Sequence, residues 1–131
     1  MIQVVDASVV VAALVDDSPT GRWCEQALQE GPLFAPHLMP FEVANIVRRL
    51  VLRGELDDTA GALAIDDLAR LAVDMAPYQA VASRVWELRD NLTAYDAAYV
   101  ATAEMIGGRL VTLDERLARA PGVECEIVTP P

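Results

Sequence analysis

The chain has 131 residues, a formal net charge of -10 at pH 7, and a composition that is 53% hydrophobic and 5% aromatic. This length suits one domain, and the apolar content predicts a core of mainly Ala, Val and Leu. The sequence contains no Lys, which excludes a P-loop and any mechanism that needs a catalytic Lys. The negative charge also excludes a protein that coats nucleic acid through a broad basic surface.

The sequence predicts neither a membrane-spanning segment nor a structural zinc site. The apolar stretch 4–15 carries Asp6, has no basic flank before it, and is too short to span a bilayer. Cys24 and Cys125 lack a metal-binding spacing, so we interpret them as buried thiols, with a zinc site or a disulfide as the less favoured alternative. We therefore expect a soluble cytoplasmic protein.

Hydrophobic periodicity and breaks at Gly and Pro divide the chain into short strands that alternate with helices. The predicted strands are 2–6, 33–35, 72–75, 109–112 and 125–128. The predicted helices are 7–15, one that begins near 19, 41–53, 57–71, 78–89, one from about 93 to 106, and 115–120. This alternation predicts an α/β domain with a mainly parallel sheet.

Four carboxylates occupy positions that suggest a shared site. Asp6 and Asp114 each follow a predicted strand and precede a helix, at the sheet edge where ligands bind in parallel α/β folds. Glu42 and Asp96 lie in the first turns of predicted helices. Each acid also has a capping explanation, and Thr93 with Asp96 occupies capping-box positions. Four acids in such places together nevertheless favour a functional site.

If the four carboxylates converge, their charges require a counter-ion. Two like charges about 4 Å apart repel by roughly 4 kcal/mol at an effective dielectric constant of about 20. A hard divalent cation would relieve this repulsion, and carboxylate oxygens suit Mg²⁺ or Mn²⁺. Because phosphate is the usual partner of a metal held by few carboxylates, the pattern predicts metal-dependent phosphate chemistry.

Four segments, in their order and spacing, resemble the PIN-domain ribonucleases, and among them the VapC-type toxins of bacterial toxin-antitoxin systems. The segments are VVDAS, FEVANIVRR, LTAYDAAYVATAE and LVTLDERLARA, and the likeness covers nearly the whole chain. It implies a single PIN domain over residues 1–131, folded as a three-layer sandwich whose central, mainly parallel sheet is flanked by helices. It also implies a hydrolase, an endoribonuclease that uses Mg²⁺ or Mn²⁺ to cut RNA.

The resemblance also assigns the acids. It makes the four carboxylates both catalytic residues and metal ligands: Asp6, Glu42, Asp96 and Asp114. Three of them would hold the main ion, while Glu42 would position a second ion or the attacking water. Glu115 and Arg116 stand where some relatives carry a further acid, so the sequence leaves open whether a second metal site is complete.

Three more residues are candidates for contacts near the substrate. The resemblance matches Ser8 and Thr112 to small hydroxyl positions beside the first and fourth acids. Arg49 lies seven residues after Glu42, on the same stripe of its helix, and we expect it to contact an RNA phosphate. The alternative for this arginine is a solvated surface charge.

The resemblance further implies a homodimer and a small VapB-type antitoxin that covers the site. We expect the antitoxin in a groove between the early helices, with these apolar side chains as candidates: Leu14, Trp23, Leu28, Leu50 and Leu56. The alternative function is a catalytically silent PIN module that acts only through protein binding. A haloacid-dehalogenase-like phosphatase is disfavoured, because Ser8 stands where it needs a second Asp and the chain has no Lys.

Overall fold

A five-stranded sheet forms the centre of the protein, which we describe from a computed structural model of residues 1–131. Every strand pair is parallel, and the strand order is β3-β2-β1-β4-β5. The strands are β1 (Gln3–Val5), β2 (Leu33–Pro36), β3 (Asp74–Ala76), β4 (Arg109–Val111) and β5 (Ile127–Val128). The prediction of a mainly parallel sheet is therefore confirmed.

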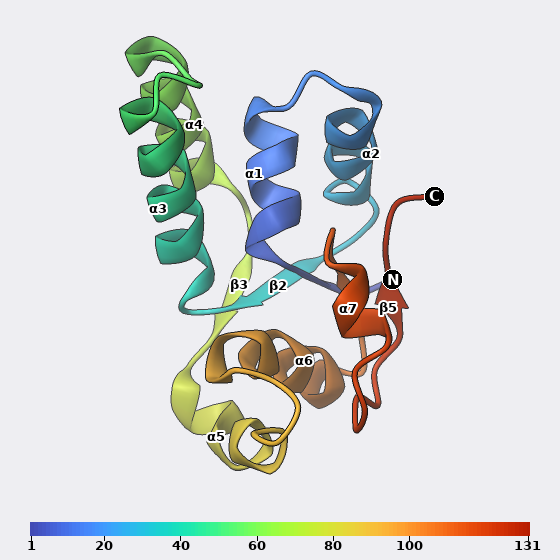
Figure 1. Cartoon of the computed structure of the whole chain (residues 1–131). Coiled ribbons are helices and arrows are strands. Elements are labelled where there is room, and N and C mark those ends of the chain that lie inside the picture. Colours follow the sequence, from blue (N-terminus) through green and yellow to red (C-terminus); the bar gives the residue numbers. More distant parts are fainter.

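Helices cover both faces of this sheet (Figure 1). On one side lie α1 (Ala7–Val15), α2 (Pro19–Ala27), α3 (Met39–Leu52) and α4 (Asp58–Arg70). On the other side lie α5 (Tyr78–Glu87) and α6 (Ala94–Ile106), while the short α7 (Glu115–Ala118) lies near β5. The three-layer α/β sandwich expected from the sequence is thus the observed architecture.

The core follows from the composition of the central elements. Val4 and Val5 of β1 and Leu110 of β4 are 0% exposed, as expected for parallel strands covered on both faces. Helix α6 is buried continuously over Ala97–Ala103, where most side chains are small. Small side chains let a helix backbone approach the sheet closely, and α6 packs against β1, β2 and β4. This packing fixes the position of the α6 N-terminus, which carries Asp96.

Some predicted boundaries are wrong by a few residues. Strand β3 is Asp74–Ala76 rather than 72–75, because its extent is set by pairing with Phe34, Ala35 and Pro36 of β2. Strand β5 is shorter than predicted, at Ile127–Val128. Helix α3 begins at Met39, two residues before the predicted start, since a proline fits the first turn of a helix.

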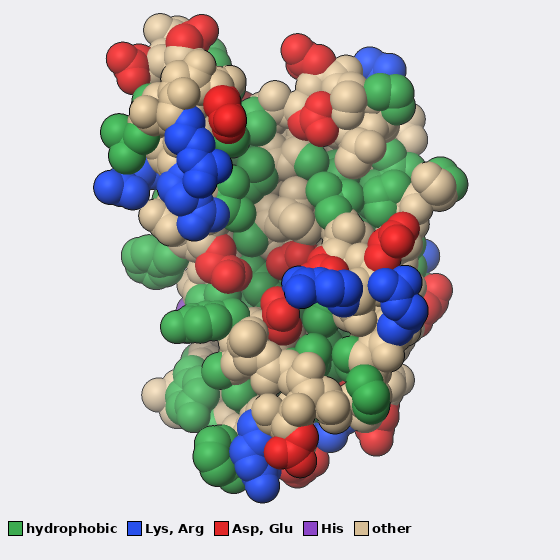
Figure 2. Space-filling model, in the orientation of Figure 1, with side chains coloured by type: hydrophobic (Ala, Val, Ile, Leu, Met, Phe, Trp, Pro, Cys, Tyr) green, Lys and Arg blue, Asp and Glu red, His purple; other side chains and the backbone are tan.

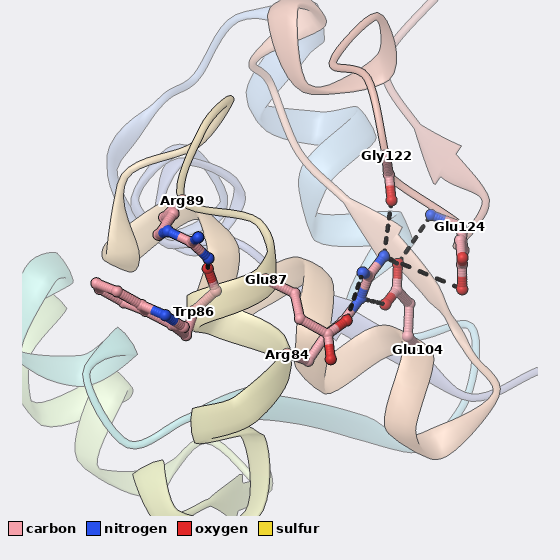
Figure 3. A network of polar contacts seen from close by, with 7 residues as sticks. All are labelled: Arg84, Trp86, Glu87, Arg89, Glu104, Gly122 and Glu124. Carbon is pink, nitrogen blue, oxygen red and sulfur yellow. Dashed lines mark hydrogen bonds and ion pairs between the residues drawn. The ribbon is translucent and has the colours of Figure 1, made fainter.

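A polar cluster joins α5, α6 and the loop before β5 (Figure 3). The Nε of Arg84 donates to Oε1 of Glu104 at 2.6 Å, and its Nη2 donates to the Gly122 carbonyl oxygen at 2.7 Å. The backbone N–H of Glu124 donates to Oε2 of Glu104 at 2.8 Å. The side chains of Arg84 and Glu104 are only 26% and 13% exposed, so this ion pair fastens the C-terminal loop to the α5–α6 layer.

Both cysteines are free thiols, so the alternative of a disulfide is wrong, and the prediction of a buried thiol is confirmed for Cys24. Cys24 is buried and Cys125 is half-buried, and burial raises the pKa of both thiols to about 11. A thiol with such a raised pKa is protonated at neutral pH and acts as a small apolar group. No helix of the fold combines the length and the apolar character that crossing a membrane would require.

Candidate active site

The predicted acids gather around the point where the sheet changes direction. The chain builds β2 and β3 on one side of β1, then returns to add β4 and β5 on the other side. Such a switch point leaves a crevice at the carboxyl ends of the two strands that flank it. Asp6 follows β1, and Asp114 follows β4, so both lie beyond the carboxyl ends of the two strands that flank the switch point.

Two hydroxyl groups hold the carboxylate of Asp6. Ser8 Oγ donates to Oδ2 of Asp6 at 2.8 Å, and Thr112 Oγ1 donates to the same oxygen at 2.7 Å. The Asp6 side chain makes no capping hydrogen bond to the backbone of α1. The interpretation of Asp6 as a helix cap is therefore wrong, and its other carboxylate oxygen is left for another partner.

The same two hydroxyls fix the loop after β4. Thr112 Oγ1 accepts from the N–H of Asp114 at 3.0 Å, and Ser8 Oγ accepts from the N–H of Leu113 at 3.2 Å. Thr112 is 0% exposed, and its contacts orient Asp6 and the backbone of Asp114. Ser8 makes the same kind of contacts from α1. A contact of Thr112 or Ser8 with the substrate stays a prediction.

Glu42 lies in the first turn of α3 and is held by α6. The hydroxyl of the buried Tyr99 donates to Oε1 of Glu42 at 2.5 Å. Burial raises the pKa of Glu42, the Tyr99 hydrogen bond opposes this shift, and the charges of Asp6 and Asp96 add to it. Burial and the neighbouring Glu42 also raise the pKa of Tyr99 above its usual range, which keeps the phenol protonated as a donor.

Asp96 lies in the first turn of α6 and has no hydrogen-bond partner for its carboxylate. The capping box is only half formed, because the N–H of Asp96 donates to Thr93 Oγ1 at 3.2 Å without a return contact. Burial raises the pKa of Asp96, the charges of Asp6 and Asp114 raise it further, and Arg116 opposes them. Of the four acids, Asp96 is therefore the one whose repulsion by neighbouring carboxylates is least offset by hydrogen bonds or a paired cation.

Asp114 is paired with Arg116, two residues further along the chain. The guanidinium donates from Nε to Oδ1 at 3.0 Å and from Nη2 to Oδ2 at 2.8 Å, a bidentate ion pair. The backbone N–H of Arg116 also donates to Oδ1 at 2.9 Å, so Asp114 caps α7 as the sequence suggested. Hydrogen bonds from Arg116 hold the pKa of Asp114 below its usual value.

The four acids thus form one electrostatic cluster, although each has a different partner. The charge of Asp6 raises the pKa values of both Glu42 and Asp96, and Figure 2 shows acidic side chains gathered near the middle of one face, with basic side chains beside them. The donors are all carboxylate oxygens, which suits Mg²⁺ or Mn²⁺. No three His, Cys, Asp or Glu side chains are placed so that they could hold one metal ion together. Binding an ion through three acids therefore requires side-chain movement.

Two residues of this site, Tyr99 and Arg116, were not predicted from the sequence, and the structure does not test the predicted role of Arg49. Tyr99 follows Asp96 by three residues, and this helical spacing could have revealed it. Sequence analysis considered Arg116 only because some relatives carry an acid near this position. It did not predict the ion pair that Arg116 forms with Asp114. Arg49 is exposed on α3 and makes no hydrogen bond or ion pair, so its contact with RNA stays a prediction.

Comparison with known proteins shows the family of the chain. The family model described as the PIN domain matches residues 4–123. Ribonuclease VapC9 from Mycobacterium tuberculosis (strain ATCC 25618 / H37Rv) is 41% identical over 128 residues, which cover 98% of this chain and 98% of the relative. The chain belongs to the PIN-domain family of VapC ribonucleases.

Two solved VapC structures show the same fold with much lower sequence identity. VapC20 from Mycobacterium tuberculosis, described as a toxin that cleaves the sarcin-ricin loop, has a TM-score of 0.71 at 15% identity and covers 98% of this chain and 99% of its own. VapBC2 from Rickettsia felis, bound to a DNA fragment from its promoter, has a TM-score of 0.67 at 14% identity, with coverage of 97% and 98%. These likenesses show that the chain shares its overall fold with both structures.

Proposed function

We propose that this VapC protein is an endoribonuclease toxin that hydrolyses RNA with a divalent cation and is neutralised by a VapB-type antitoxin. The observation that carries the proposal is the cluster of four carboxylates at the switch point of a PIN fold. Membership of the VapC ribonucleases supports the reaction, and the all-oxygen donor set supports Mg²⁺ or Mn²⁺ as the cofactor.

Three acids are proposed to hold the main ion: Asp6, Asp96 and Asp114. A bound ion would lower the pKa of a water ligand and stabilise charge on the phosphate. Ser8 and Thr112 leave one oxygen of Asp6 without a protein partner, and Asp96 has both oxygens without one. These oxygens would be available to a cation without breaking a hydrogen bond of the protein.

Glu42 is proposed to position the attacking water. Its raised pKa makes it a better proton acceptor than an ordinary carboxylate, and Tyr99 fixes its direction through Oε1. Arg49 is the proposed phosphate contact on the same helix. Seven residues at 1.5 Å rise place it roughly 10 Å along α3 from Glu42, a distance suited to a phosphate beyond the cleaved one.

We propose two protein partners, an antitoxin and a second copy of the chain. The predicted antitoxin residues Leu14, Trp23, Leu28, Leu50 and Leu56 are all partly buried, so each keeps some surface for a partner. A separate groove of about 440 Å³ lies between α3 and α4. On its rim Leu52 is 69% exposed and Ile65 is 39% exposed, which supports contact with a second copy. We also propose that the complex acts in the cytoplasm.

The test of the proposed function is cleavage of a panel of structured RNAs by purified protein freed of antitoxin. Reactions contain Mn²⁺, Mg²⁺ or EDTA, and Asp96→Asn is compared with Asp90→Asn, which makes the same chemical change at an exposed residue that contributes to none of the pKa shifts in the cluster. We expect cleavage that needs the metal and is lost only in Asp96→Asn. Metal binding without cleavage would instead identify the catalytically silent module.

A further inference from the structure

The acidic cluster includes a positively charged side chain, that of Arg116, which pairs with the predicted metal ligand Asp114. Arg116 occupies both oxygens of Asp114 through Nε and Nη2. A carboxylate that shares both oxygens with a guanidinium fork has its favoured in-plane positions filled. A divalent cation can therefore bind both oxygens of Asp114 only if the Arg116 side chain moves away.

Arg116 is free to make this movement. Its side chain is 82% exposed, while the side chain of Asp114 is 26% exposed, so the arginine lies on the outer side of the pair. An exposed ion pair contributes little stability, and a cation of double charge can displace it. The N-terminal cap of α7 does not depend on the Arg116 side chain, because the backbone N–H of Arg116 donates the capping hydrogen bond to Oδ1 of Asp114.

The displaced guanidinium stays beside the site. Arg116 also acts electrostatically on Asp96, across the cluster from Asp114. Once a cation neutralises these carboxylates, the arginine has lost its partner next to the place where a phosphate would bind. Guanidinium groups bind phosphate through the same two-pronged geometry that they use for carboxylates.

We propose that Arg116 exchanges partners during catalysis: it pairs with Asp114 in the metal-free protein and contacts an RNA phosphate when the cation takes Asp114. Arg116 is then a substrate-binding residue and also a competitor of the metal ion. This inference rests on the proposed metal-dependent ribonuclease function.

Arg119 provides a matched control for charge. It lies just after α7, is exposed, and contributes to the pKa of Asp114 only through its charge, without a hydrogen bond. Arg119→Gln therefore removes the same charge from nearly the same place but leaves the Arg116–Asp114 pair intact. Arg116→Lys keeps the charge of Arg116 and removes the fork.

The first experiment measures Mn²⁺ affinity by calorimetry without RNA. We expect Arg116→Gln to bind Mn²⁺ about two- to fivefold more tightly than the wild type, the range of an exposed ion pair. Arg119→Gln should change the affinity by clearly less. Equal effects of the two variants would overturn the proposal, since they would show general electrostatics rather than competition for Asp114.

The second experiment measures RNA affinity with the cation bound. Fluorescence anisotropy of a labelled single-stranded RNA in Ca²⁺, with intact RNA verified on a gel, separates binding from cleavage. Arg116→Gln should weaken binding roughly three- to tenfold and lower the slope of log K against log salt by about 0.7, the share of one phosphate on a single strand. Arg116→Lys should keep most of that slope, and an unchanged slope in Arg116→Gln would overturn the proposal.

The two experiments separate this proposal from the proposed function. A wild-type protein that binds Mn²⁺ but neither binds nor cleaves RNA would refute the ribonuclease function and, with it, the phosphate contact. The Mn²⁺ comparison would still decide whether Arg116 competes for Asp114. Absence of Mn²⁺ binding by the wild type and by Arg116→Gln alike would refute the metal dependence itself.

Discussion

Replacing Thr112 by Val should loosen the centre of the site with little change in shape. The two side chains have nearly the same volume, so the substitution removes one hydroxyl from a position that is 0% exposed. That hydroxyl donates to Asp6 at 2.7 Å and accepts from the N–H of Asp114 at 3.0 Å. Both contacts are lost together, and water cannot reach the buried position to replace them.

The magnitude follows from the two lost contacts. A hydrogen bond to an ionised carboxylate contributes about 1.5–3 kcal/mol, and a buried N–H without a partner costs about 1–3 kcal/mol. Asp6 keeps the hydroxyl of Ser8, and Asp114 is partly exposed, so the lower half of each range applies. We expect Thr112→Val to lower the free energy of unfolding by about 2.5–4 kcal/mol and to reduce cleavage, because Asp6 is no longer fixed from two sides.

Urea unfolding at pH 7 measures this change, with Thr112→Ser as the control. Serine keeps the hydroxyl and loses one methyl group, so its destabilisation should be about 1 kcal/mol. A Thr112→Val protein that is no less stable than Thr112→Ser would refute the reasoning. That result would mean that the two hydrogen bonds contribute nothing beyond the packing of the side chain.

Three further changes test other contacts of the structure. Asp96→Asn should abolish cleavage yet stabilise the metal-free protein at pH 7 in urea unfolding. Burial and Asp6 raise the pKa of Asp96 in the folded state, so its stabilising contribution is present below its usual value of 3.8 and is lost as the pH rises through the raised value. The advantage of Asp96→Asn over the wild type should therefore disappear when unfolding is repeated below about pH 4. Tyr99→Phe removes the hydroxyl that donates to Glu42 at 2.5 Å. Because this hydrogen bond lowers the pKa of Glu42, titration of Glu42 followed by NMR should show a further increase of its pKa. An unchanged pKa would exclude a role for this hydrogen bond. Arg84→Met leaves the half-buried charge of Glu104 without its main partner, and thermal unfolding should show that the free energy of unfolding falls by about 2–4 kcal/mol. The control Arg70→Met breaks an exposed ion pair and should change this free energy by less than about 1 kcal/mol.

The sheet and the position of the acids could be predicted because both depend on local patterns. A run of apolar residues that ends in Asp6 predicts a strand and an acid at its carboxyl end, and the same pattern recurs before Asp114. In a parallel sheet all carboxyl ends lie at one edge, so both acids could be placed at that edge without knowledge of the strand order. The order itself placed β1 and β4 side by side and decided that they meet.

The partners of the acids could not be predicted, because they are set by tertiary contacts. Tyr99 is 57 residues from Glu42, and Thr112 is 106 residues from Asp6. Composition and periodicity describe which face of a helix is buried, but not which polar atom it meets there. Helix capping could not be predicted from the sequence position alone either. Asp6 and Asp114 both precede a helix, but only the side chain of Asp114 accepts a capping hydrogen bond.

The distribution of partners suggests the order in which the site takes up a cation. Asp6 has two hydroxyl donors on one oxygen, Glu42 has a phenol, and Asp114 has a guanidinium, whereas the carboxylate of Asp96 has none. Hydroxyl donors satisfy a lone pair without neutralising the charge, so the repulsion between Asp6 and Asp96 persists in the metal-free protein. Asp6 and Asp96 are therefore the pair whose repulsion a bound cation would relieve most. Asp114 would be the costlier ligand, because its use would break an ion pair that the protein already holds.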